Sequence, residues 1–322
     1  MTVDPASNTM RTHRAKRLGL PGVIHELIRN RVLYILVLPA ALYTFIYGYI
    51  TLPYMAIAFE KFNFRTGIFS QWVGMKNFQY FFKSTWAATV TRNTLILNFL
   101  FIVIVYASSI VLALLLNEIR AKRFLKVSQT VMLFPYFISW VVVSYMLQGL
   151  LNTSTGLLNR VIVGMGGAAV SFYSTPGYWY VILILLRVWK YIGWTSVIYL
   201  SVITGIDESL YEAAYIDGAG RLQSVRYITL PLLLPTASIL TLMEIGRIFY
   251  GDFSMFYAVI RDNGSLMPVA EVIDTYVYRT FKLTGNPSLS MAVGMYQSLV
   301  GFALVFGSNT LANKLYPEGA LF

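Results

Sequence analysis

Residues 94–116 read TLILNFLFIVIVYASSIVLALLL, a run that contains no charged side chain over its whole length. A helix rises about 1.5 Å per residue, so about 20 mostly apolar residues are enough to cross the hydrocarbon core of a bilayer. The same run in a soluble domain would offer no polar face to water. This stretch therefore predicts a transmembrane helix.

Five further stretches have the length and composition of a span. They cover about residues 32–59, 127–150, 178–202, 232–250 and 289–311. Six spans place both termini on the same side of the membrane. We predict an all-α integral membrane protein with six transmembrane helices, in which a leader (1–31) precedes the membrane domain (32–316) and a short tail (317–322) follows it.

The composition supports this class and excludes several kinds of site. Hydrophobic residues make up 57% of the chain and charged residues 12%, whereas a soluble domain carries about 25% charged residues. The chain has no cysteine, and His13 and His25, its two histidines, precede the first span. Disulfides, thiol chemistry and a histidine-ligated metal in the core are therefore excluded.

The net charge of +11 concerns the orientation of the chain. No pattern typical of nucleic-acid binding accompanies it, so we assign it to cytoplasmic loops and expect no nucleic-acid partner. With the N-terminus inside, the cytoplasmic segments hold 13 Lys and Arg residues and the outer segments nine. The chain is predicted to be a multi-pass protein of the lipid bilayer with a cytoplasmic N-terminus.

The leader is basic, as in a signal peptide, but the apolar run over 32–59 is far longer than the ~7–15 apolar residues of a cleaved segment. We interpret this run as a retained first span. Residues 21–31 can form a helix in the membrane interface, because one face of it carries Val23, Ile24, Leu27 and Ile28.

The most informative polar stretch is the loop between the fourth and fifth spans, over residues 204–231. From residue 205 onward it reads GIDESLYEAAYIDGAGRLQSVRYITLP. Asp207 can cap a first short helix, and we expect Gly218 and Gly220 to supply the positive φ angles that end it.

A second short helix follows in the same loop. It is amphipathic, with Leu222, Val225 and Ile228 on one side. Pro231 then fits the first turn of the fifth span, where a missing N–H costs nothing. The loop is thus predicted to be two short helices with a break between them.

The spacing in this loop resembles the signature of permease subunits of ATP-binding-cassette importers. That signature is Glu-Ala-Ala, three residues, Gly, nine residues and Ile-x-Leu-Pro, placed in a cytoplasmic loop before the penultimate span. The chain matches it without departure. The resemblance implies that the ATPase-coupling residues are Glu212, Ala213, Ala214, Asp217, Gly218, Gly220, Ile228, Leu230 and Pro231.

The resemblance also implies an assembly. It implies the type I importer architecture in the bacterial cytoplasmic (inner) membrane, with a second homologous permease, two ATPase subunits and an extracytoplasmic solute-binding protein. The chain has no Gly-x-x-x-x-Gly-Lys-Ser/Thr loop, so ATP and Mg²⁺ are expected on the partner subunits. We therefore predict a permease that is not itself an enzyme and holds no cofactor, driven by a rigid-body switch that the loop transmits.

Three other stretches resemble the carbohydrate branch of these importers. WVGMKNF over 72–78 and WKYIGW over 189–194 are similar to patterns of that branch, and VIDTYVYR over 272–279 is similar to polysaccharide-type permeases that include the alginate-oligosaccharide importer. The resemblance implies an oligosaccharide substrate, with an acidic, alginate-type chain as the expected one.

Four ionisable residues fall inside predicted spans, where charges are costly and mark functional sites. Arg187 and Lys190 share one face of the fourth span, and Glu244 and Arg247 share one face of the fifth. Counting 1.5 Å per residue places both pairs at one depth, in the outer half of the membrane. Asp252 is expected at the outer edge.

Two interpretations of these charges stay open. Glu244 can form a structural interhelical pair with Arg187 or Lys190. Alternatively, the charges line a water-filled cavity, where three cations against one carboxylate leave a positive surplus that suits an anionic sugar chain.

Aromatic side chains are further candidates for the pathway, because sugar rings stack on aromatic faces. Aromatic residues are equally expected as belts at the membrane interface. The candidates are Trp140, Trp189, Trp194 and Tyr250.

Two other function classes compete with an importer subunit. A stand-alone ion-coupled transporter would explain the spans and the buried charges but not the loop. A membrane-embedded enzyme such as a glycosyltransferase is disfavoured, because the sequence has no metal-type carboxylate cluster, no nucleophile paired with a base and no nucleotide loop.

Overall fold

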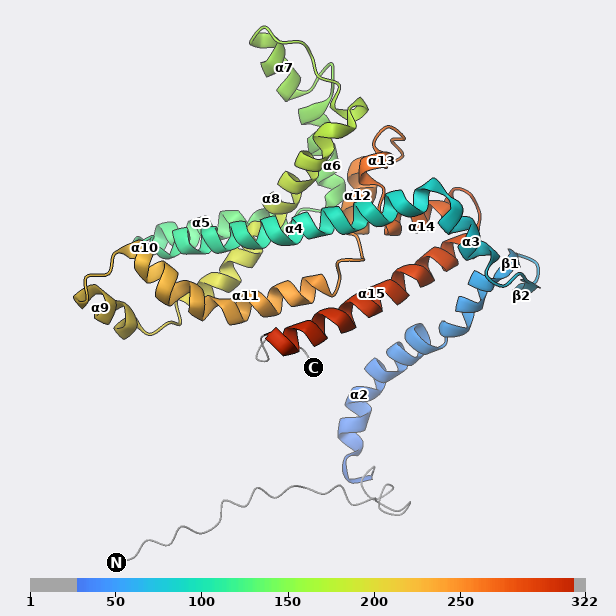
Figure 1. The fold of residues 1–322 in the computed structure, drawn as a ribbon, viewed down its shortest axis with the longest axis horizontal. Helices are drawn as coiled ribbons and strands as arrows, with labels where there is room; N and C mark the ends of the chain where they lie inside the picture. The colour runs from blue at the N-terminus through green and yellow to red at the C-terminus, as the bar shows by residue number, and fades with distance from the viewer. Residues whose placement is uncertain (1–27, 316–322) are drawn as a thin grey trace, which may run out of the picture. The chain divides into compact units, whose positions relative to one another are not determined.

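A computed structural model describes residues 28–315 and divides the chain into two compact units, Met1–Met55 and Ala56–Phe322. Helices dominate the described residues, and the only strands among them form a two-stranded hairpin (Figure 1). Five helices are long and apolar enough to cross a membrane, and one bent pair can supply a sixth crossing. The predicted all-α membrane class is confirmed. Most of the leader, including most of its predicted interfacial helix, and the tail lie outside the described residues.

The first unit contains α2 (Arg31–Thr44) and a π-helical turn, η1 (Phe45–Tyr49). A 3₁₀ segment, η2 (Leu52–Phe59), continues the chain into the second unit. No side chain of α2 is buried, which in an apolar helix of this length indicates contact with lipid. The whole stretch Arg31–Phe59 qualifies as one span, in agreement with the predicted first span.

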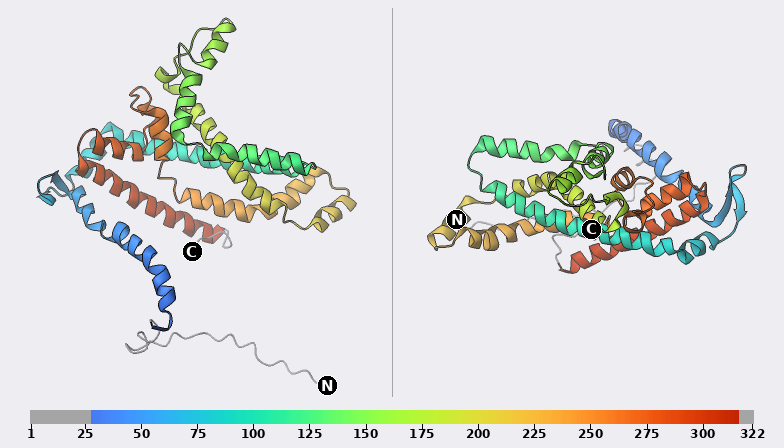
Figure 2. Two further views of the ribbon diagram at one scale, coloured as in Figure 1. Left: turned by 180° about the vertical axis from the view of Figure 1, so that it is seen from behind. Right: turned by 90° about the horizontal axis from the view of Figure 1, so that it is seen from above.

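In the second unit, the long helices α4 (Thr85–Asn117) and α8 (Trp179–Ile203) pack along each other, and α8 also packs against α5 (Lys122–Phe137). Figure 2 shows this arrangement from two further sides. A Cβ on Gly193 of α8 would collide with the carbonyl oxygen of Met132 in α5. The close approach of these two backbones therefore requires glycine at this position.

The third predicted span is not a single helix. α5 ends at Phe137, and α6 (Trp140–Leu151) leaves it at an angle of 96° (Figure 1). Ser139 caps α6 by accepting a hydrogen bond from the backbone N–H of Val142. The predicted span over 127–150 is thus a bent pair of helices and not one straight helix. Both halves are apolar, and hydrophobicity alone does not show where a helix bends.

The stretch over residues 60–83, which follows the first span, is a hairpin and a short helix. β1 (Glu60–Asn63) pairs antiparallel with β2 (Gly67–Trp72), and α3 (Lys76–Lys83) follows. The side-chain amide of Asn77 donates to the carbonyl oxygens of Ala58 and Glu60, at 2.8 and 3.0 Å. This amide fixes α3 to the base of the hairpin.

Three short helices, α12 (Phe253–Ile260), α13 (Met267–Ala270) and α14 (Ile273–Lys282), precede the long α15 (Pro287–Leu315). Arg279 is buried here and pairs with Asp262 and with Glu271, whose Oε1 lies 3.2 Å from the arginine Nε. Burial raises the pKa of Glu271 to about 7, although Arg279 opposes the shift. This assembly therefore has a core of charges as well as apolar side chains.

The remaining helices are α7 (Leu157–Gly164) and the elements of the loop between the fourth and fifth spans. The loop holds α9 (Glu208–Ile216) and α10 (Arg221–Ser224), and a π-helical turn, η5 (Val225–Thr229), leads into α11 (Leu230–Ile245). α9 and the β-hairpin lie at opposite ends of the second unit (Figure 1).

Candidate functional site

A cavity of about 820 Å³ lies among α4, α8, α11 and the segment that follows α11. Most of the residues predicted for a substrate pathway line it. These are Arg187, Trp194, Glu244, Arg247, Tyr250 and Asp252. Lys190 and Trp189 do not belong to its wall.

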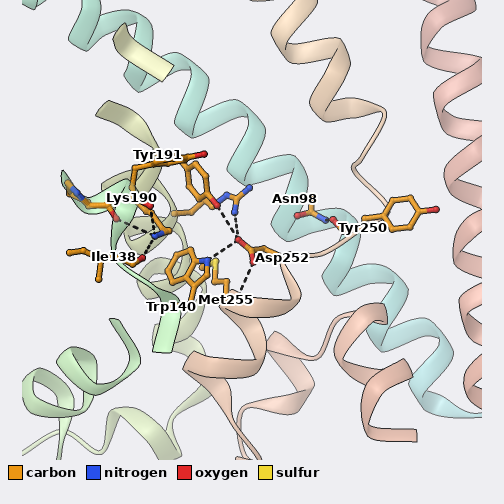
Figure 3. A network of polar contacts seen from close by, with 11 residues as sticks. Asn98, Ile138, Trp140, Lys190, Tyr191, Tyr250, Asp252 and Met255 are labelled. Atoms are coloured by element: carbon orange, nitrogen blue, oxygen red, sulfur yellow. Dashed lines mark hydrogen bonds and ion pairs between the residues drawn. The ribbon is translucent and has the colours of Figure 1, made fainter. Parts of the chain in front are cut away.

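An ion pair at the cavity wall joins Arg187 to Asp252, with 2.7 Å between Nη1 and Oδ2. The same oxygen accepts hydrogen bonds from the indole N–H of Trp140 (3.0 Å) and the hydroxyl of Tyr191 (3.3 Å), as Figure 3 shows. The other oxygen caps α12 by accepting from the backbone N–H of Met255 at 3.1 Å. Asp252 is therefore the junction of α6, α8 and α12, and its expected place at the outer edge of the membrane stays a prediction.

The guanidinium of Arg187 is held by aromatic rings as well as by Asp252. Its central carbon lies 4.0 Å from the ring centroid of Tyr191 and 5.5 Å from that of Phe101. Within the described residues it donates one hydrogen bond, to Asp252, whereas a guanidinium has five N–H donors. A rigidly held, cavity-lining arginine thus keeps donors available for a ligand.

Lys190 serves a different site, the break between α5 and α6. Its ammonium donates to the carbonyl oxygens of Pro135 (3.2 Å) and Tyr136 (3.1 Å) and, at short range, to that of Ile138 (Figure 3). The carbonyl of Pro135 also accepts from the backbone N–H of Ile138, whereas Lys190 is the donor that the described residues show for the carbonyls of Tyr136 and Ile138. Lys190 is 6% exposed, and its nitrogen lies 5.0 Å from the ring centroid of Trp140. Lys190 therefore does not line this cavity, and its place in the substrate pathway stays a prediction.

The predicted surplus of positive charge is also absent from the cavity wall of this chain. The wall carries two arginines, Arg187 and Arg247, and three carboxylates, Glu244, Asp252 and Asp274. The expected pair of Glu244 with a cation of the fourth span is not formed, because Arg187 pairs with Asp252 instead. Among the described residues, neither Glu244 nor Arg247 has an ion-pair partner.

The segment over 246–252, which joins α11 to α12, forms part of the cavity wall without being a regular helix. Irregular backbone at the end of a span is tolerated where other groups satisfy its hydrogen bonds. The side-chain amide of Asn98, on α4, donates to the carbonyl oxygens of Ile248 (2.8 Å) and Tyr250 (3.0 Å). Asn98 is the polar residue near the start of the apolar run 94–116, a signal that sequence reasoning left unused.

Two further side chains hold the same segment. Gln297 of α15 donates to the carbonyl oxygen of Phe249 (2.9 Å) and to the carboxylate of Asp274 (3.0 Å). That carboxylate also accepts the backbone N–H of Gly251 at 2.6 Å. Burial raises the pKa of Asp274, and the hydrogen bonds from Gly251 and Gln297 oppose this shift. Asp274 and Gln297 were both missed as site residues.

The aromatic candidates separate into two groups. Trp194 stacks on Tyr136 with ring centroids 4.6 Å apart and 12° between the planes, and both rings line the cavity together with Tyr250. Trp140 instead binds Asp252 through its indole N–H. Trp189 is 38% exposed and does not line the cavity.

The loop over 204–231 has most of the local structure predicted for it. Asp207 caps α9 by accepting from the backbone N–H of Ser209 (3.0 Å), which lowers the pKa of Asp207. Gly218 adopts φ +80° after α9. Gly220 does not have a positive φ: at −79° it begins α10, and its N–H donates to the side chain of Gln223 at 2.7 Å. One glycine, not two, provides the left-handed turn.

The second half of the loop merges with the fifth span. Arg221–Ile245 is one continuous helix, and the π-helical turn η5 immediately precedes the helical turn that contains Pro231. Proline lacks an N–H and its ring crowds the carbonyl four residues earlier, which is where a local π turn relieves the helix.

The residues named for ATPase coupling lie mainly at the surface. Glu212, Ala213, Asp217, Gly218 and Pro231 are exposed, whereas Ala214, Ile228 and Leu230 are half-buried. Two apolar side chains of α9, Tyr215 and Ile216, are 81% and 83% exposed. Large apolar side chains that lie together at a water-exposed surface are typical of a surface that binds another protein.

The sequence of this chain is similar to that of known permeases. The family described as "Binding-protein-dependent transport system inner membrane component" matches residues 106–314. The chain is 37% identical to the polygalacturonan/rhamnogalacturonan transport system permease protein YteP of Bacillus subtilis (strain 168), over 98% of this chain and 97% of that protein. It is 28% identical to the sn-glycerol-3-phosphate transport system permease protein UgpA of Pectobacterium atrosepticum, over 85% and 90% of the two chains.

Two solved structures contain a chain with a similar fold. One is a bacterial ABC transporter involved in the import of the acidic polysaccharide alginate, with a TM-score of 0.84 and 29% identity over 91% of this chain and 99% of that chain. The other is a bacterial alginate ABC transporter in complex with an alginate pentasaccharide-bound periplasmic protein, with a TM-score of 0.82 and 29% identity over 90% and 97%.

Proposed function

Since this chain belongs to the family of inner membrane components of binding-protein-dependent transport systems, we propose that it is one permease subunit of an ATP-driven importer for an acidic oligosaccharide. Family membership confirms the resemblance drawn from the loop, and the similar structures confirm the type I permease fold. The observation that carries the proposed substrate is Arg187: a ring-held arginine at the cavity wall with unused donors.

The number of charged residues in the cavity wall does not favour an anionic ligand. The hydrogen-bonding groups of the wall that have no protein partner support one better. Two of the three carboxylates, Asp252 and Asp274, have oxygens that already accept hydrogen bonds from protein donors, which leaves Glu244 as the carboxylate of the wall without an ion-pair partner among the described residues. Arg187 and Arg247, in contrast, retain N–H groups without protein acceptors among the described residues. A uronate sugar carries one carboxylate, and arginine binds carboxylates in a planar, two-bond geometry.

The relatives support the same class of ligand. YteP is described for polygalacturonan and rhamnogalacturonan, and both structural neighbours are described for alginate. The Trp194–Tyr136 stack in the cavity of this chain offers flat aromatic surface beside Arg187. An aromatic face next to a fixed cation fits a sugar ring that bears a carboxylate.

The assembly that we propose has a second homologous permease, two ATPase subunits and an extracytoplasmic solute-binding protein, in the bacterial inner membrane with the N-terminus cytoplasmic. α9, with its exposed Tyr215 and Ile216, is the proposed contact with one ATPase. The alternative, a stand-alone ion-coupled transporter, predicts uptake by this chain alone; our proposal predicts none without the ATPase subunits and ATP.

Uptake into vesicles that contain the assembled importer tests the substrate class. Acidic and neutral oligosaccharides of equal length are compared for wild type, Arg187→Gln and Arg247→Gln. We expect each variant to lower the acidic-to-neutral ratio of kcat/KM by about 10-fold, the value of one charge-assisted hydrogen bond. The exposed Arg160 of α7, outside the cavity, gives the control Arg160→Gln. An unchanged acidic-to-neutral ratio of kcat/KM in both cavity variants would show that Arg187 and Arg247 do not select an acidic substrate.

Substitution of Gly218 tests the loop. A Cβ there meets no atom within 4 Å, so φ +80° is the only obstacle. Asn tolerates this conformation and β-branched Val does not. ATPase assembly and ATP-driven uptake should therefore fall in the order wild type, Gly218→Asn, Gly218→Val. Equal activity of the Asn and Val variants would contradict a role for the turn.

A further inference from the structure

We propose that Asn98 and Gln297 are positioning residues that set the affinity of the cavity for sugar by holding the segment 246–252 in place. This inference uses the proposed function only for the identity of the cargo, a sugar chain. Asn98 lines the cavity and Gln297 does not, so Gln297 is the residue that can act through the segment alone, without contact with the substrate.

The segment needs these partners because the end of α11 leaves carbonyl groups without intrahelical donors. Three consecutive carbonyls, those of Ile248, Phe249 and Tyr250, receive their hydrogen bonds from the two side-chain amides. A side-chain amide has two N–H donors. Asn98 uses its nitrogen for two carbonyls, and Gln297 uses its own for one carbonyl and for Asp274.

The segment is also seated closely against α14. A Cβ on Gly251 would lie 2.9 Å from Cγ2 of Val272 and 3.0 Å from Oδ2 of Asp274. The backbone N–H of Gly251 donates to the same carboxylate oxygen. α4, α14 and α15 therefore each contribute a polar side chain to one short stretch of backbone.

The held segment carries four cavity-lining side chains, those of Arg247, Ile248, Tyr250 and Asp252. Asp252 in turn orients Arg187. A displacement of about 1 Å in such groups is enough to weaken binding strongly. Loss of an amide should therefore alter the affinity for substrate more than the rate of the transport cycle.

The chain offers a matched control on the same helix. Asn93 of α4 also donates to two carbonyl oxygens, those of Pro268 and Glu271, each at 3.1 Å. It is more buried than Asn98, but neither it nor its two partners line the cavity. Asn93→Leu should cost stability without changing affinity.

The test compares Gln297→Met, Asn98→Leu and Asn93→Leu in the assembled importer. For the first two variants we expect KM to rise about 10-fold, as for a lost hydrogen bond that leaves a carbonyl unpaired, while kcat stays within about threefold of wild type. Asn93→Leu should keep the wild-type KM. Where Gln297→Met does not fold, Gln297→Glu, which has the same size but no amide donor, replaces it.

A second readout does not depend on the substrate. The chain has no cysteine, so a nitroxide on Ile248→Cys reports on the segment alone. The spectrum should show greater mobility with Gln297→Met and no change with Asn93→Leu. Immobile spectra and wild-type KM values in the Gln297 and Asn98 variants overturn the inference. If the wild-type importer moves no oligosaccharide, the proposed function fails, and the nitroxide still decides whether the amides hold the segment.

Discussion

At the scale of the residue, Arg187 and Lys190 show how neighbours on one helical face acquire separate roles. They are three residues apart on α8, yet Arg187 lines the cavity and Lys190 binds carbonyl oxygens at the α5–α6 break. The sequence predicted a shared site because helical spacing places them on one face. It could not show that one side chain meets a carboxylate and the other meets backbone ends.

Lys190→Met is expected to lower stability and leave selectivity unchanged. The substitution removes the donor to the carbonyl oxygens of Tyr136 and Ile138, at a cost of about 1–3 kcal/mol for a buried unpaired group. Thermal unfolding in detergent should show a lower Tm, and the exposed Lys282→Met serves as the control. A lower acidic-to-neutral transport ratio at an unchanged Tm would indicate that Lys190 acts on the substrate and not on the stability of the fold.

The other site residues show which polar signals a sequence carries. Asn98 was visible as an amide within an apolar run, where a polar group requires a partner. Asp274 lies within the stretch 272–279 that the sequence analysis singled out. Its hydrogen bond from the backbone N–H of Gly251 could not be predicted, because Gly251 is remote from it in sequence. The cavity charge could not be predicted, because it depends on which carboxylates the fold brings to the wall.

At the scale of the element, the contact between α5 and α8 depends on Gly193, which meets the carbonyl of Met132. The sequence indicates small residues where helices approach closely in membranes, but it does not say which glycine is the contact. The bend between α5 and α6 was missed for a related reason: the cap at Ser139 is a local signal within an otherwise uninterrupted apolar pattern.

Gly193→Ala should severely reduce the yield of folded protein, since the added methyl group must force two helix backbones apart and overpacking costs about 1–3 kcal/mol or more. The control is Gly294→Ala in α15, where an added Cβ meets no atom within 4 Å. Size-exclusion profiles of the detergent-solubilised variants make the comparison. A monodisperse Gly193→Ala protein with wild-type Tm would contradict the close contact.

The assembly of α12, α13 and α14 should lose stability as the pH rises. Burial raises the pKa of Glu271 from its ordinary value to about 7, so the folded state holds this proton more tightly than the unfolded state. The stabilising contribution is complete below about pH 4.5 and is lost as the pH rises through about 7. Tm measured from pH 5 to pH 8 should fall more for wild type than for Glu271→Gln. Parallel curves would show that Glu271 does not carry the dependence.

At the scale of the whole molecule, low charge and repeated apolar runs were sufficient to predict the membrane class, and the spacing of one loop was sufficient to predict the family. Orientation rests on the distribution of Lys and Arg alone. The partners that would complete an importer stay predictions, because the sequence of one chain does not contain them.

The predicted orientation places α9 in the cytoplasm. Because the chain has no cysteine, Ser209→Cys gives a single thiol on this helix. An impermeant maleimide should label it in inverted vesicles and not in intact cells. Labelling from the outside of intact cells would reverse the topology and remove α9 from any contact with an ATPase.

The division of labour on α8 has an evolutionary consequence. Lys190 binds the carbonyls at the break between α5 and α6, whereas Arg187 lines the cavity. Arg187 can therefore be replaced in evolution when the substrate changes, without loss of the bend between the two helices. Among permeases that share this bent helix, the residue aligned with Lys190 should stay basic whatever the cargo. The residue aligned with Arg187 should vary with the charge of the sugar. One turn of this helix would then contain a position that is constant among the permeases and a position that differs with their substrate.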